Sequence, residues 1–195
     1  GDRYTWTGGP CLRAQGLPGA EAQSSSRRCP EIMRFISEPK KVSPAVLAGA
    51  AAGVASLALY LLTLAPSLTW GWNGKGADGG ELLAAANTFG IPHPPGYPTY
   101  TLLLKAFATV VPVGDFAFRG NLLSAVLAAG SVVTVYWTVL CLCRSIRSEA
   151  PEALAITAAA LGGTVAATSP LFWSQATITE VYTLNALFAG VLLLL

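Results

Sequence analysis

Charged side chains are scarce in this chain. Only 11% of its 195 residues are charged, whereas soluble domains carry roughly 25%. From Val42 onward the apolar runs are too long and too poor in charge for the core of a water-soluble protein. The scarcity of charge therefore predicts an all-α, polytopic transmembrane protein, because helices satisfy their own backbone hydrogen bonds within a bilayer.

Several patterns that would indicate other functions are also missing. Cys141 and Cys143 have no second pair of ligands that would complete a zinc site, so we predict no metal site. The sequence contains no glycine-rich loop of the kind that cradles phosphates and no basic surface suited to nucleic acid. We therefore expect no nucleic-acid partner.

The two ends of the sequence differ from the rest. Residues 1–32 are rich in Gly, Ser, Arg and Pro and precede Met33, the only methionine, so we interpret them as a non-native or disordered leader. The other end stops within an apolar run that is about 24 Å long as a helix, shorter than a bilayer core of about 30 Å. We therefore predict that residues 33–195 form the N-terminal part of a longer transmembrane domain, truncated at its C-terminus.

Apolar runs predict four membrane spans, at about residues 44–64, 118–142, 153–168 and 180–195. Lys40 and Lys41 precede the first span, and Arg144 and Arg147 follow the second. Basic residues next to spans favour the cytoplasmic side of a membrane. We therefore predict a cytoplasmic N-terminus and a large external loop over residues 65–117.

Residues 97–111 are also apolar and would reverse this topology if they crossed the membrane. They provide only about 22 Å of helix, whereas the bilayer core is about 30 Å thick. Thr101, Lys105 and Thr109 recur every four residues and would form one narrow polar stripe. We interpret this segment as a juxtamembrane helix in the outer interface, with Lys105 facing lipid headgroups, in preference to a short span.

Asp78 and Glu81 open a predicted helix at about residues 79–89. The pattern Asp-x-x-Glu before an apolar run fits a capping box, in which the side chains bind free backbone N–H groups. It equally fits a catalytic site, because a carboxylate can act as general base toward the hydroxyl group of an acceptor. The sequence leaves both interpretations open.

Four basic residues are candidates for neutralising a phosphate leaving group: Lys75, His93, Lys105 and Arg119. His93 fits a stiff, exposed proline turn equally well, and Arg119 fits an interfacial residue whose head reaches out to water. Glu180 lies at the mouth of the last predicted span, where an unpaired carboxylate is costly. We assign Glu180 either to the site or to a helix cap.

Two motifs resemble the signature of a membrane family long catalogued as a domain of unknown function: Asp78-Gly-Gly-Glu81 and Gly90-Ile-Pro-His93-Pro-Pro-Gly-Tyr-Pro98. That family belongs to the glycosyltransferase-C (GT-C) superfamily and includes protein O-mannosyltransferases. Further similar runs are Arg119-Gly-Asn-Leu-Leu-Ser-Ala, Ser169-Pro-Leu-Phe-Trp-Ser-Gln and Glu180-Val-Tyr-Thr-Leu-Asn185. The resemblance covers about residues 65–195.

The resemblance implies a GT-C fold with juxtamembrane helices in the first external loop. It implies transfer of a sugar, mannose, from a polyprenyl-phosphate donor to a protein or glycan hydroxyl, with inversion at the anomeric carbon. Asp78 would be the catalytic base and Glu81 its neighbour in the acidic motif. The implied substrate-binding residues are His93, Tyr97, Lys105, Arg119 and Glu180. The implied partners are membrane lipid, the lipid-linked donor and the acceptor, while the need for a divalent metal is left open.

Two other functions fit the sequence, namely a transporter or flippase of lipid-linked substrates and a non-catalytic assembly subunit. A transporter would place ionisable residues near the bilayer midplane, whereas the ionisable residues of this chain gather at one surface. We expect the active site on the external or lumenal face. The Ala- and Gly-rich helices and compact loops lead us to favour a bacterial inner membrane over the endoplasmic reticulum.

Overall fold

The computed structural model describes residues 42–69, 78–146, 149 and 151–195. Within these residues the chain is helical and contains no strand, which confirms the all-α prediction. The described helices are α2 (Pro44–Leu62), α3 (Gly79–Thr88), α4 (Pro98–Val110), α5 (Phe116–Ile146), α6 (Glu152–Thr168), α7 (Pro170–Ala176) and α8 (Tyr182–Leu194). The predictions for the leader, Lys40, Lys41, Lys75 and Arg147 lie outside the described residues.

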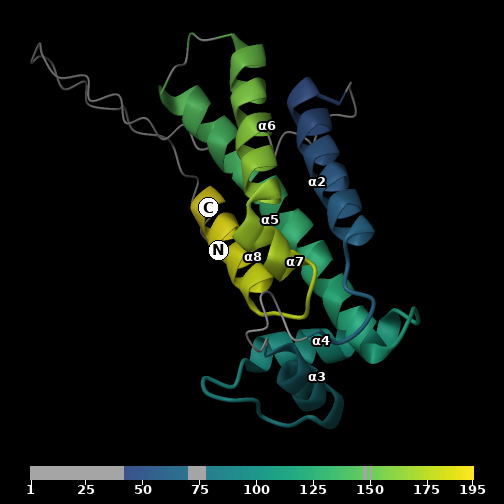
Figure 1. The fold of residues 1–195 in the computed structure, drawn as a ribbon. Coiled ribbons are helices and arrows are strands. Elements are labelled where there is room, and N and C mark those ends of the chain that lie inside the picture. The colour runs from purple at the N-terminus through teal and green to yellow at the C-terminus, as the bar shows by residue number, and fades with distance from the viewer. Residues whose placement is uncertain (1–41, 70–77, 147–148, 150) are drawn as a thin grey trace, which may run out of the picture.

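Helix α5 is the centre of the molecule, and α2, α6 and α8 pack around it (Figure 1). Glycines allow two of these helices to approach α5 closely. A Cβ atom on Gly53 of α2 would lie 2.7 Å from the side chain of Val133, and one on Gly162 of α6 would lie 3.1 Å from that of Val139. These contacts confirm that the small residues of the two helices serve close packing.

Two fully buried tyrosines tie α2 to its neighbours. The hydroxyl group of Tyr136 in α5 donates a hydrogen bond of 2.8 Å to the carbonyl oxygen of Ala45. The hydroxyl group of Tyr60 in α2 donates one of 3.0 Å to the carbonyl oxygen of Ala167. Each bond gives a buried phenol the partner that it needs in an apolar interior, and together they fix how α2 lies against α5 and α6.

Two helices, α2 and α5, are long and apolar enough to cross a membrane. Helices α6 and α7 meet the same test only together, with a bend of 66° between them, and α8 is a shorter apolar helix. Large apolar side chains are exposed on the outer faces of the bundle, including Val54, Leu62, Leu161, Val165 and Leu192. These features support an integral membrane protein, whereas four crossings and their orientation stay predictions.

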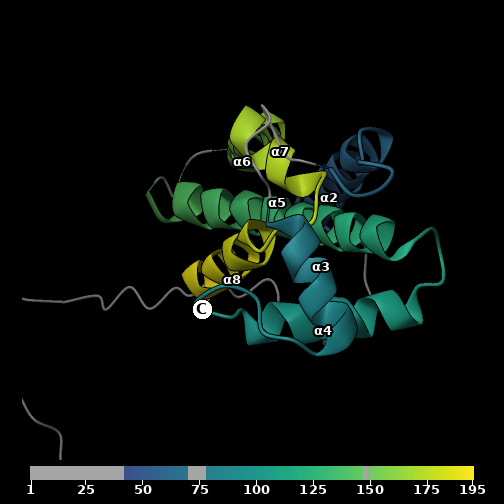
Figure 2. The same ribbon diagram turned by 60° about the horizontal axis from the view of Figure 1, so that its bottom comes forward.

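Helices α3 and α4 lie at one end of the bundle, the end at which the chain also turns from α7 into α8 (Figures 1 and 2). With 13 residues, α4 is about 20 Å long and too short for a bilayer core, as the juxtamembrane interpretation requires. One apolar cluster joins α3, α4, α5 and α8, and its members include Leu82, Tyr100, Leu104, Leu123 and Leu184. This cluster fixes the position of the site described next.

Candidate acidic site

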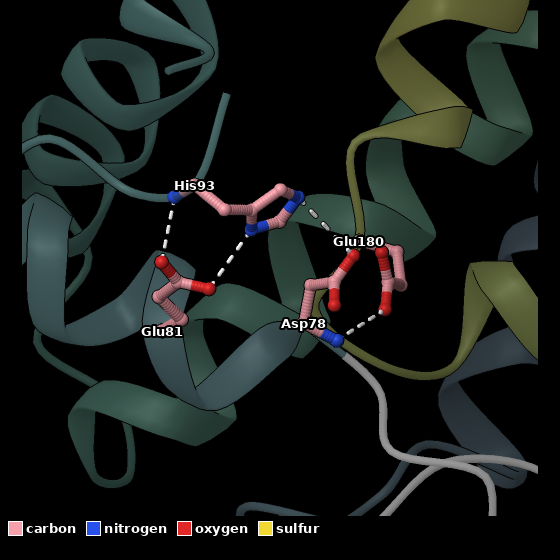
Figure 3. Close-up of polar contacts among 4 residues, drawn as sticks. All are labelled: Asp78, Glu81, His93 and Glu180. Atoms are coloured by element: carbon pink, nitrogen blue, oxygen red, sulfur yellow. Dashed lines mark hydrogen bonds and ion pairs between the residues drawn. The ribbon is translucent and has the colours of Figure 1, made fainter. Parts of the chain in front are cut away.

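Asp78, Glu81, His93 and Glu180 come together in space (Figure 3). Asp78 and Glu81 stand at the beginning of α3, His93 in the loop between α3 and α4, and Glu180 in the loop between α7 and α8. Glu180 is 102 residues away from Asp78 in the sequence. The structure thus gathers four of the seven predicted site residues at one end of the bundle.

His93 connects the two carboxylates of the Asp-x-x-Glu motif. Its backbone N–H donates a hydrogen bond of 2.6 Å to Oε1 of Glu81, and its ring Nδ1 lies 2.8 Å from Oε2 of the same side chain. The other ring nitrogen, Nε2, lies 3.6 Å from Oδ2 of Asp78. The ring of Tyr97 meets the imidazole edge-on with 5.4 Å between centroids, so this predicted residue borders the site.

The two carboxylates do not form a capping box. The backbone of Asp78 is helical, with φ −71° and ψ −1°, and its side chain makes no capping hydrogen bond to α3. Glu81 binds His93 instead of reaching back to the backbone N–H of Asp78. The capping interpretation is therefore wrong, because neither carboxylate is used by the helix terminus and both are half exposed.

Glu180 is buried beneath Asp78, with only 4% of the residue exposed. Its Oε1 accepts a hydrogen bond of 3.1 Å from the backbone N–H of Asp78 (Figure 3). Its Oε2 is buried and has no hydrogen-bond partner among the described residues. The N-cap residue of α8 is Val181, so the interpretation of Glu180 as a helix cap is also wrong. Burial, and next the negative charge of Asp78, raise the pKa of Glu180.

Two glycines allow α3, α5 and the α7–α8 loop to approach closely enough for these contacts. A Cβ atom on Gly79 would lie 2.9 Å from the carbonyl oxygen of Thr179. A Cβ atom on Gly120 of α5 would lie 2.8 Å from the side chain of Leu83. Any larger residue would push the loop that carries Glu180 away from the beginning of α3, where Asp78 stands.

Asn121, which we did not predict as a site residue, connects α5 to the segment after α2 and to the α7–α8 loop in the interior of the bundle. Its Nδ2 donates hydrogen bonds to the carbonyl oxygens of Ala65 at 2.9 Å and Ser67 at 3.0 Å. Its Oδ1 accepts one of 2.8 Å from the hydroxyl group of Thr179, and the residue is only 2% exposed. The sequence offered only a weak signal, a polar amide within a largely apolar run, and Asn185 in α8 has the same character but is exposed.

Lys105 binds the neighbouring helix α3. Its amino group donates hydrogen bonds to the backbone carbonyl of Asn87 at 2.9 Å and to that residue's Oδ1 at 3.3 Å. It also lies 5.3 Å from the ring centroid of Phe89. The cation thereby stabilises the C-terminal end of α3, while its contact with lipid headgroups or substrate stays a prediction.

Arg119 likewise binds backbone carbonyls instead of joining the acidic residues. Its guanidinium group donates to the carbonyl oxygens of Ala108 at 2.8 Å, Val113 at 3.2 Å and Gly114 at 3.0 Å. These bonds close the turn between α4 and α5.

The charges of the site reinforce one another. Hydrogen bonds from His93 lower the pKa of Glu81, and the hydrogen bond to Glu81 is the largest cause that raises the pKa of His93. Burial, the second-largest cause, lowers the pKa of His93, and the negative charges of Glu81, Asp78 and Glu180 raise it further by smaller amounts. In the part of the chain that the structure describes, no group of three or more His, Cys, Asp or Glu residues could hold a metal ion.

An apolar pocket of about 330 Å³ adjoins the histidine loop. It lies between α3 and α4, and its walls include Phe89, Ile91, Pro95, Gly96 and Leu102. Ile91 and Pro95 stand two residues on either side of His93. The acidic site therefore borders an apolar surface.

Comparison with known proteins places residues 78–195 in the family described as the protein O-mannosyl-transferase TMEM260 N-terminal domain. Protein O-mannosyl-transferase TMEM260 of Mus musculus is 39% identical over 150 residues, which are 76% of this chain and 19% of the mouse protein. Protein O-mannosyl-transferase tmem260 of Dictyostelium discoideum is 28% identical over 139 residues, or 70% of this chain and 15% of that protein. No solved structure matches the chain significantly.

The chain thus spans about a fifth or less of the length of these relatives. Both relatives come from eukaryotes, so our expectation of a bacterial inner membrane finds no support among them. The matched region contains all seven predicted site residues, because it begins at Asp78 and extends past Glu180.

Proposed function

Because this chain belongs to the family of the protein O-mannosyl-transferase TMEM260 N-terminal domain, we propose that it supplies the acidic site of a membrane glycosyltransferase. The enzyme would move mannose from a polyprenyl-phosphate donor to a hydroxyl group of a protein. The observation that carries the proposal is the meeting of Asp78, Glu81 and His93 with Glu180 at one end of an apolar bundle.

Asp78 is the general base of the proposed reaction. Its side chain is 49% exposed, so an acceptor hydroxyl can approach it, whereas Glu180 is buried. Asp78 takes the proton of the hydroxyl group while the oxygen attacks the anomeric carbon of the donor. The bond between that carbon and the phosphate oxygen breaks, and its electron pair leaves with the phosphate. The products are an O-glycoside of inverted configuration and a polyprenyl phosphate.

The surroundings of the site suit a lipid-linked donor. The apolar pocket beside the His93 loop offers a surface for the hydrocarbon part of such a molecule. The basic residues that the structure describes are His93, Lys105, Arg119 and Arg144, and each already binds a protein group. A cation from the described part of the chain would therefore have to bind the leaving phosphate in addition to, or in place of, these protein contacts.

A transporter is less well supported. The sequence of α5 contains no Asp, Glu, Lys, Arg or His between Arg119 and Arg144, and α2 contains none at all. A transport pathway would place ionisable groups at such depths. The non-catalytic alternative depended on a capping role for Asp78 and Glu81, which the structure contradicts.

The proposal is tested with the complete natural protein that contains this sequence, expressed in membranes. Wild type, Asp78→Asn and Asp115→Asn would receive radiolabelled polyprenyl-phosphate mannose, and label in protein would be counted. Asp115 is the matched control, because its carboxylate lies at the same end of the molecule but accepts a bond of 2.6 Å from the N–H of Phe118, a cap that Asn also makes.

We expect Asp78→Asn to transfer mannose at least about 100-fold more slowly than wild type, because a general base usually contributes a factor of this size. The transfer rate of Asp115→Asn should stay near that of wild type. Equal transfer by wild type and Asp78→Asn would contradict the role of Asp78. A wild type that transfers no mannose from this donor, although it is expressed and folded, would contradict the proposed donor.

A further inference from the structure

We propose that His93 is a positioning residue, an imidazolium anchored on Glu81 that holds the Asp78 carboxylate in place. The inference rests on the proposed function, in which Asp78 is the base. It differs from the role first predicted for His93, a contact to the donor phosphate, because the structure has both ring nitrogens facing carboxylates.

The anchor on Glu81 is built from two contacts to one carboxylate. The backbone N–H of His93 binds Oε1 and the ring Nδ1 binds Oε2, at 2.6 Å and 2.8 Å. Pro92 and Pro94 flank the histidine and restrict the backbone on both sides. With the ring held in this way, its other nitrogen points at Oδ2 of Asp78 (Figure 3).

Carboxylates face both nitrogens of the His93 ring. Glu81 faces it from α3, Asp78 from the beginning of that helix and Glu180 from the α7–α8 loop, while Tyr97 contributes an uncharged ring edge. An imidazolium donates a hydrogen bond from Nδ1 to Glu81 and turns the N–H of Nε2 toward Asp78, 3.6 Å away, whereas a neutral imidazole would turn a lone pair toward one of these carboxylates. The cation is therefore the form that fits the site.

The ring of His93 lies between the two carboxylates of the acidic motif. Asp78 and Glu81 stand about one helical turn apart, and His93 contacts Glu81 at 2.8 Å and Asp78 at 3.6 Å. A positively charged ring in this place offsets the repulsion between two negative side chains. His93 therefore acts on the reaction through Asp78.

The first test measures transfer against pH in the complete protein for wild type, His93→Gln and Glu81→Gln. Glutamine keeps hydrogen-bonding groups but has no charge. We expect His93→Gln to lower kcat by about tenfold, a fraction of what a general base contributes, with the donor KM within about twofold. The alkaline limb of its pH–rate profile should disappear, because glutamine has no ring that titrates.

In the profile of transfer rate against pH, Glu81→Gln should keep the alkaline limb but shift it to lower pH, because His93 loses the carboxylate that raises its pKa. A His93→Gln variant with raised donor KM and unchanged kcat would overturn the proposal in favour of a phosphate contact. Unchanged kcat, KM and pH profile would overturn it as well.

The second test does not depend on transfer. Diethylpyrocarbonate modifies imidazole only in its neutral form. The complete protein would be treated at a series of pH values, and mass spectrometry would give the rate at which the His93 peptide is modified. The dependence of this rate on pH reports the protonation of the His93 side chain. We expect a midpoint above the ordinary pKa of 6.5 in wild type and a lower midpoint in Glu81→Gln. Identical midpoints would overturn the proposal even if mannose is transferred. A shifted midpoint in a protein that transfers no mannose would support the His93 contacts and contradict the proposed function instead.

Discussion

The three carboxylates of the site differ in their surroundings, and at the scale of single residues this difference separates their roles. Asp78 and Glu81 are 49% and 50% exposed at their side chains, whereas the whole Glu180 residue is 4% exposed. An exposed carboxylate can meet a substrate. A buried one that accepts from the backbone supports the neighbour that it binds, here Asp78.

Replacing Glu180 separates its hydrogen bond from its charge. Glu180→Gln keeps an oxygen that accepts from the N–H of Asp78, so we expect transfer to be largely retained. Glu180→Ala leaves that N–H unpaired and should lower the free energy of unfolding by about 1–3 kcal/mol. Thermal unfolding of both variants in detergent checks this, and equal losses in the two variants would contradict it.

The raised pKa of Glu180 also has a pH consequence. The folded protein favours the protonated carboxyl group, so the stability that this preference contributes is complete below the ordinary pKa of 4.5 and is lost as pH rises through the raised value. Glu180→Gln cannot ionise and escapes this loss. We therefore expect the Tm of Glu180→Gln, relative to wild type, to rise between pH 4.5 and neutral pH, and a constant difference would contradict the expectation.

At the scale of elements, the site depends on how closely the beginning of α3 approaches the α7–α8 loop. Gly79 and Gly80 are neighbours in the same helix but meet different surroundings. A Cβ atom on Gly79 would lie 2.9 Å from the backbone carbonyl of Thr179. Among the described residues, one on Gly80 would meet only the side chain of Leu68, at an ordinary 3.7 Å. The two positions therefore form a matched pair.

We expect Gly79→Ala to lower both Tm and transfer, because the backbone of the loop that carries Glu180 must move. Gly80→Ala should leave transfer unchanged and raise stability by up to about 1 kcal/mol, the difference in helix propensity between alanine and glycine. Thermal unfolding and transfer assays of the two variants compare them directly. Similar losses in both would show that the approach of the loop is not what Gly79 provides.

At the scale of the whole molecule, one buried side chain joins three distant segments. Asn121 in α5 binds the residues that follow α2 and, through Thr179, the loop that precedes α8. The backbone N–H of Ala65 also donates to the carbonyl oxygen of Thr177 at 3.1 Å. These bonds fix the end of the bundle on which α3 and α4 lie.

Asn121→Ala should therefore destabilise the molecule by about 2–4 kcal/mol, since it removes three hydrogen bonds made by a buried side chain and creates a small cavity. Asn185→Ala, which removes an exposed amide from α8, is the control and should change stability little. Thermal unfolding of the two variants in the same detergent measures the difference. Equal midpoints would contradict the role of Asn121 in holding the junction.

Much of the fold follows from local properties of the sequence. Scarce charge and long apolar runs predict the helices, and the length of 97–111 distinguishes α4 from a span, because 13 residues cannot cross a bilayer. The spacing of Asp78 and Glu81 predicts that both stand on the first turn of one helix, as they do. The spacing could not decide whether the two carboxylates cap the helix or form a catalytic site, because that depends on which distant residues the fold places beside them.

The sequence could not predict the contact partners of three charged residues, Lys105, Arg119 and Glu180. A lysine or arginine near a membrane surface has the same side chain whether it binds a phosphate or the carbonyl of a neighbouring helix, and only packing selected Asn87 and Ala108 as partners. The sequence by itself determined an apolar helical protein with its ionisable residues concentrated outside the longest apolar runs, because hydrophobicity and charge act through local composition. The tertiary structure alone decided that Glu180 lies beneath Asp78 and that His93 connects two carboxylates, because these contacts join segments that meet only when α3, α5 and the α7–α8 loop pack together.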